Sequence, residues 1–150
     1  MIRSISRRIV TGAALSVLSS TASACLKSTE PQASLLNLKG TWSYTAVQTS
    51  PIRETLSGTL DISSESGTSF QGRLDVVSTN SQTGQMTALN GLVSGAESDG
   101  NVIDFDASLE STPRRHVGQL VADTISGTWV GSTSGGTTPS GTFRVERQTP

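Results

Sequence analysis

Cysteine and histidine are nearly absent from this chain of 150 residues, which holds one of each, Cys25 and His116. A zinc site needs three or four histidine, cysteine or carboxylate ligands. A serine hydrolase needs a histidine beside an activated serine, and the sequence has no Gly-x-Ser-x-Gly turn. Asp99, Asp104 and Asp106 lack the alternating ligand spacing of a calcium loop. We therefore expect no metal, no cofactor and no enzymatic activity.

Clusters of basic side chains are also missing beyond the first residues. Arg3, Arg7 and Arg8 lie in the first eight residues, and the rest of the chain carries 8 basic and 12 acidic side chains. Nucleic-acid binding requires clustered Lys and Arg. The glycine-rich stretch 131–141 has no lysine and leads into no helix, so it lacks the features of a phosphate-binding loop. We expect no nucleic-acid partner.

Long apolar runs are absent, and the longest, at residues 9–18, is too short to span a bilayer. It follows a basic segment and precedes small residues, which is the layout of a signal peptide. An exported protein with one cysteine cannot form an internal disulfide, so another covalent use of Cys25 is expected. We predict a signal peptide at 1–24, a modified cysteine with a polar tether and short turn at 25–38, and a folded domain at 39–148.

The four residues Ala22-Ser23-Ala24-Cys25 resemble the bacterial lipobox, although that family prefers Leu at the first position. The resemblance implies an acyl lipid on Cys25 and a cell-envelope protein anchored to a membrane. Leu26 stands where an inner-membrane retention signal would place Asp, which implies the outer membrane in a cell that has one. Secretion without a lipid is the alternative, and Arg7-Arg8 leaves the general and twin-arginine export routes open.

Helical spacing is missing after residue 40, where apolar residues alternate with polar ones in period two. Turn formers separate the alternating stretches, at Pro51, 65–67, 80–84, 99–101, Thr112-Pro113, Asp123 and 135–140. The connections are too short for parallel crossovers, so the strands should run antiparallel. The predicted strands are 40–48, 54–63, 69–78, 87–94, 101–109, 114–121, 124–130 and 140–147.

Glycines recur on the apolar face of these strands, at Gly58, Gly72, Gly91, Gly118 and Gly127. Inner-face glycines allow strong bending and close backbone approach, as in a sheet that coils shut. They also suggest volume left free inside. The opposite face is polar, so we predict an all-β fold, an eight-stranded antiparallel up-and-down β-barrel with an apolar interior and a wetted exterior.

Gly40-Thr41-Trp42 on the first strand, together with Arg144 and Arg147 on the last, resembles the calycin pattern of lipocalins, avidins and barrel-type protease inhibitors. In that superfamily a basic side chain from the final strand packs across the tryptophan ring at the closed end. The resemblance implies that Trp42 pairs with Arg147, which shares the inward phase, or less favourably with Arg144. This role is structural and implies no ligand.

Two functions remain open. In the first, the barrel binds a small apolar or amphiphilic ligand, with Tyr44, His116 and Trp129 as wall residues and Arg114 and Arg115 attracting a negative charge at the rim. In the second, the barrel is filled by its own side chains and presents loops to an envelope protein, for example as a protease inhibitor.

Overall fold

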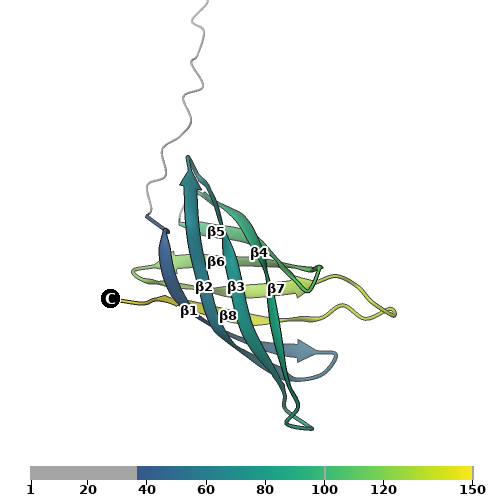
Figure 1. Cartoon of the computed structure of the whole chain (residues 1–150). Helices are drawn as coiled ribbons and strands as arrows, with labels where there is room; N and C mark the ends of the chain where they lie inside the picture. The colour runs from purple at the N-terminus through teal and green to yellow at the C-terminus, as the bar shows by residue number, and fades with distance from the viewer. Residues whose placement is uncertain (1–36, 100, 150) are drawn as a thin grey trace, which may run out of the picture.

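Eight antiparallel strands close into a barrel in the computed structural model, which describes residues 37–99 and 101–149 (Figure 1). Each strand pairs with the next, and β8 pairs with β1, so no strand edge is left open. The predicted fold class is confirmed. The strands are β1 (Gly40–Ser50), β2 (Glu54–Ser66), β3 (Ser69–Asn80), β4 (Met86–Ser98), β5 (Val102–Leu109), β6 (Thr112–Val121), β7 (Thr124–Gly131) and β8 (Ser140–Arg147).

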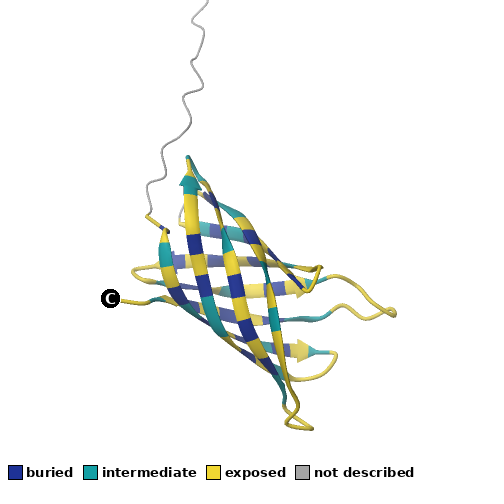
Figure 2. Cartoon of the chain, in the orientation of Figure 1, coloured by how far each residue is buried: buried dark blue, intermediate teal, exposed yellow. Residues whose placement is uncertain are grey.

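Buried and exposed residues alternate along the strands, as the banding in Figure 2 shows. The pattern follows from the period of a strand, whose successive side chains point to opposite faces of the sheet. Asp61 and Asp75 are exposed, as the predicted phase requires. On β6, His116 and Leu120 face inward, whereas Val117 and Val121 face solvent.

The turn between β5 and β6 lies at Glu110 and Ser111, so the prediction of a turn at Thr112-Pro113 is wrong. Both turn residues have positive φ, 47° and 66°, which is the geometry of a tight two-residue hairpin. Pro113 instead lies near the start of β6, opposite Ser108. A proline is tolerated there because it lies at a strand end, where a lost ladder hydrogen bond costs little.

The inner-face glycines mark close contacts between neighbouring strands. A Cβ atom on Gly58 would lie 2.0 Å from the carbonyl oxygen of Asp75, and one on Gly127 would lie 2.0 Å from that of Val117. The space beside these glycines is therefore filled by backbone. The expectation that they leave room for a ligand is wrong, whereas the expectation of close backbone approach is confirmed.

Trp42 closes one end of the barrel. Its indole Nε1 donates a hydrogen bond to the carbonyl oxygen of Leu38 (2.9 Å), and the Arg147 guanidinium lies 4.2 Å from its ring centroid. Arg147 also donates to the carbonyl oxygens of Asn37 and Lys39. The predicted pairing of Trp42 with Arg147 is confirmed.

Arg144 does not take part in this closure. It lies on the outer wall of β8, where it forms an ion pair with Glu146 (2.5 Å). The predicted signal peptide, the tether and Cys25 lie outside the described residues. Within the described part of the chain, no helix is long and apolar enough to cross a membrane.

Candidate ligand-binding site

The end of the barrel opposite Trp42 is open. The loops that follow β1, β3, β5 and β7 surround it, at the lower right of Figure 1. A cavity of about 290 Å³ lies in this mouth. Its lining residues come from β2, β3, β4, β6 and the loop before β4, and they are Glu54, Ser78, Asn80, Gln85, Thr87, Leu89 and Arg114.

Aromatic rings fill the middle of the barrel. The rings of Phe105 and His116 are stacked with centroids 4.4 Å apart, and Phe143 meets His116 edge-on at 5.0 Å. Tyr44 stacks on Phe143 at 6.4 Å. All four side chains are buried, so the space for a ligand inside the barrel lies at the mouth.

His116 is held by two hydrogen bonds, and these assign its tautomer. Its Nδ1 lies 2.9 Å from the carbonyl oxygen of Arg114, which can only accept, so Nδ1 carries the proton. Nε2 therefore accepts a hydrogen bond from the Tyr44 hydroxyl, also at 2.9 Å. Burial lowers the pKa of His116 to about 4 and raises the pKa of Tyr44. Both side chains are uncharged at neutral pH.

Arg114 brings a cation from β6 into the mouth. Its guanidinium lies 5.1 Å from the centroid of the Trp129 ring, in the cation–π range. Its Nε and Nη1 atoms are buried and donate to no described residue, and the same is true of Nε1 of Trp129. Burial lowers the pKa of Arg114, while electrostatic interaction with Tyr44 and, to a smaller extent, with Glu54 opposes this shift. Because the Arg114 guanidinium is a partly buried cation without a carboxylate partner among the described residues, it favours a ligand that supplies oxygen acceptors.

Glu54 is the acidic side chain of the mouth. Its carboxylate Oε2 accepts a hydrogen bond from the Ser78 hydroxyl at 2.8 Å. The described residues show no ion pair between Glu54 and Arg114, although both line the same cavity. The mouth therefore presents one positive and one negative group that do not neutralise each other by contact.

Four of the five predicted ligand-site residues lie together. Tyr44, His116 and Trp129 form the floor beneath Arg114, and Arg114 lines the cavity above them. Arg115, the fifth, is placed elsewhere, because its side chain points to the outer wall and forms an ion pair with Asp104 (2.5 Å).

Apart from Arg114, none of the lining residues was predicted from the sequence as a site residue; the unpredicted ones are Glu54, Ser78, Asn80, Gln85, Thr87 and Leu89. Glu54 and Ser78 carried a usable signal, since each continues the inward phase of its strand past the buried Leu56 and Val76. A polar residue at such a position lies inside the barrel near one end. Thr87 is exposed and gave no comparable signal.

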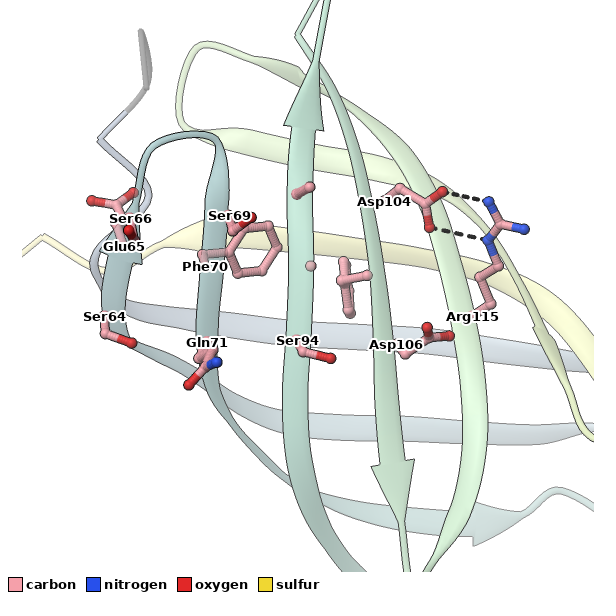
Figure 3. Close-up of a pocket in the computed structure, with 13 residues that line it drawn as sticks. Ser64, Glu65, Ser66, Ser69, Phe70, Gln71, Ser94, Asp104, Asp106 and Arg115 are labelled. Carbon is pink, nitrogen blue, oxygen red and sulfur yellow. Dashed lines mark hydrogen bonds and ion pairs between the residues drawn. The ribbon is translucent and has the colours of Figure 1, made fainter. Parts of the chain in front are cut away.

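A larger hollow of about 810 Å³ lies on the outer wall, over β2 to β6 (Figure 3). One row of cross-strand neighbours runs along it, namely Ser64, Gln71, Ser94, Asp106 and Arg115. Figure 3 shows Asp104 and Arg115 joined at one side of this hollow. Their charges satisfy each other in contact with water, so we assign the candidate site to the smaller mouth. Among the described residues, no group of three or more His, Cys, Asp or Glu side chains is placed to hold a metal ion.

Comparison with known proteins supports the architecture. No protein-family model matches the chain, and no curated protein matches it. The solved structure of EF1p2_mFAP2b bound to DFHBI is similar with a TM-score of 0.60 and 15% identity, over 74% of this chain and 94% of that chain.

Two further barrels are similar. A de novo designed fluorescence-activating beta barrel matches with a TM-score of 0.53 and 18% identity, over 73% of this chain and 93% of that chain. The redesigned beta barrel mFAP1, bound to DFHBI, matches with a TM-score of 0.52 and 18% identity, over 73% of this chain and 94% of that chain. At these identities the likeness shows that the chain has the fold of a small closed β-barrel.

Proposed function

We propose that this protein is an exported, lipid-anchored barrel that binds a small amphiphilic ligand at its open end. Arg114 carries the proposal, because it lines the cavity with a partly buried positive charge and is in ion-pair contact with no described carboxylate. An oxyanion in the cavity would gain charge-assisted hydrogen bonding from this guanidinium.

The lining of the mouth favours an amphiphilic ligand over a wholly apolar one. Most of the lining side chains are polar, and Leu89 is the one large aliphatic side chain among them. Two of the similar barrels are bound to DFHBI, which supports a small-molecule role for this fold.

Binding at the mouth is tested by titrating the purified full chain with octanoate, octylamine and L-leucine while amide shifts are recorded by NMR. We expect at least one compound to shift the amides of Ser78, Thr87 and Arg114 and to leave Trp42 at the closed end unchanged. Arg114→Gln should weaken this binding, whereas the matched outer-wall variant Arg144→Gln should not. If no compound shifts the mouth amides, the proposal fails.

The lipid anchor is proposed from the lipobox-like residues alone, since Cys25 lies outside the described residues. Mass spectrometry of the protein recovered from cells should find an acylated N-terminal Cys25, and Cys25→Ser should release the protein from the membrane fraction. An unmodified Cys25 would leave secretion without a lipid as the explanation for the signal sequence.

Protein binding is the second candidate, favoured by the filled middle of the barrel and by apolar side chains on the outer wall. Val117 and Val130 line one shallow groove over β6 and β7 and are 41% and 50% exposed. If this surface binds an envelope protein, replacing both valines with serine should abolish chemical cross-linking to it. Arg114→Gln should then have no effect.

A further inference from the structure

We infer that the mouth takes a small dipolar ligand, one that carries both an oxyanion and a protonated nitrogen, as a free amino acid does. The inference rests on the proposed function and names its ligand class. The cavity wall brings together one cationic and one anionic side chain, Arg114 and Glu54, among neutral neighbours.

The two charged side chains come from strands that are not neighbours in the barrel, β6 and β2. The charge of Glu54 acts to raise the pKa of Arg114, against the larger lowering by burial. Neither uses the other as a contact partner, because the Glu54 carboxylate accepts from Ser78 and the guanidinium lies over Trp129. Both groups therefore keep hydrogen-bonding capacity for a ligand.

A ligand of one sign fits this wall poorly. A carboxylate would gain charge-assisted hydrogen bonds from Arg114 but would be repelled by Glu54. An ammonium group would be attracted by Glu54 but repelled by Arg114. A compound with both groups matches both side chains at once, which is electrostatic complementarity within one cavity.

The size of the cavity restricts the rest of the ligand. A volume of about 290 Å³ lies at the lower end of the range for small-molecule sites. Leu89 offers one apolar contact in the lining. We therefore expect a compact dipolar group with a short apolar side chain.

Isothermal titration calorimetry of the purified full chain tests the inference with three probes that share the leucine side chain. L-Leucine carries both charges, N-acetyl-L-leucine keeps the carboxylate alone, and L-leucinamide keeps the ammonium alone. We expect L-leucine to bind at least tenfold more tightly than either of the others.

Variants assign each charge to its side chain. Arg114→Gln should reduce the affinity for L-leucine to that for L-leucinamide, and Glu54→Gln should reduce it to that for N-acetyl-L-leucine. Arg114→Lys should keep part of the preference for the carboxylate, which guards against a simple loss of packing. The outer-wall pair supplies matched controls, since Arg144→Gln and Glu146→Gln should leave the affinity unchanged.

The outcomes separate the inference from the proposed function. If octanoate or N-acetyl-L-leucine binds at the mouth as tightly as L-leucine, the dipolar class is wrong and small-molecule binding stands. The inference also falls if Arg144→Gln weakens L-leucine as much as Arg114→Gln does. If no probe binds by calorimetry and none shifts the mouth amides in the NMR titration, both proposals fail.

Discussion

Tyr44 and His116 place a neutral hydrogen bond inside an otherwise apolar cluster of rings. The same histidine bonds to the carbonyl oxygen of Arg114, so the residue that supplies the cation of the mouth is tied to the floor beneath it. Buried polar groups are tolerated when both partners are satisfied. The pair therefore holds the backbone of β6 in place at Arg114, the residue that lines the candidate site.

This pair predicts a pH dependence of stability. In the folded protein the pKa of His116 is about 4, whereas an unfolded histidine titrates near pH 6.5. The unfolded state therefore takes up a proton first as the pH falls. Neutral His116 therefore contributes to the free energy of unfolding above about pH 6.5, and this contribution is lost between pH 6.5 and pH 4. Its size is of the order of 3 kcal/mol.

Urea unfolding at pH 7.5, 5.5 and 4.5 measures the effect. The double variant Tyr44→Phe/His116→Phe removes both polar groups together and should flatten the stability profile in this range. Asp104, whose pKa is lowered by its hydrogen bond to Arg115, acts only at more acidic pH. An unchanged slope in the double variant would show that His116 is not the cause.

At the scale of single residues, alternation was enough to predict that Tyr44, His116 and Trp129 point inward. Counted back from the inward His116, the same alternation places Arg114 inside and Arg115 outside, and the prediction that both lie at the rim of the site did not apply it. Glu54 escaped notice for another reason. Its inward phase places it inside the barrel near one end, but this position alone does not show that the end is hollow.

The alternation of polar and apolar residues predicts the strands but not the exact positions of the turns between them. Glu110 and Ser111 adopt positive φ although neither residue favours it, so composition pointed instead to the nearby Thr112-Pro113. Conversely, β2 runs on through Ser66, since its serines pair with β3 and extend a hairpin whose sequence looks like a loop. Pairing partners, which lie elsewhere in the chain, determined these boundaries.

Replacing Ser111 with glycine should stabilise the barrel by about 0.5–1 kcal/mol, because glycine adopts positive φ without the penalty that serine incurs. Ser111 is exposed, so little packing is lost. Thermal unfolding followed by circular dichroism measures the change. Ser108→Gly, within β5, is the control and should destabilise the protein, and a loss of stability in Ser111→Gly would contradict the argument.

Closure of β8 onto β1 makes the whole molecule a ring of strands. The two ends of the described chain meet at this seam, where the Gln148 amide donates to the carbonyl oxygen of Thr41 (3.0 Å). Strand number and direction followed from the sequence pattern, and the Trp42–Arg147 contact followed from the calycin resemblance. The hollow at one end did not, because it depends on how side chains from several strands share one space.

A circular permutant tests this view of the molecule. Residues 37–149, joined end to end by a short Gly-Ser linker and opened between Gly135 and Gly136, should fold to the same barrel, since these glycines lie in an exposed loop. Near-ultraviolet circular dichroism and cooperative unfolding measure this outcome. Opening the ring at Ser126, inside β7, should prevent folding, and equal behaviour of the two permutants would contradict the argument.

The plug formed by Leu38, Trp42 and Arg147 also sets a direction. The described chain begins at this closed end, so Asn37 and Leu38 lie at the end of the barrel opposite the mouth. An acyl group on Cys25, as proposed, would be joined to Leu38 at the closed end by a segment at most about 47 Å long when fully extended. Attachment at the closed end would leave the mouth free of the anchor, so that a ligand dissolved in the surrounding water could enter it.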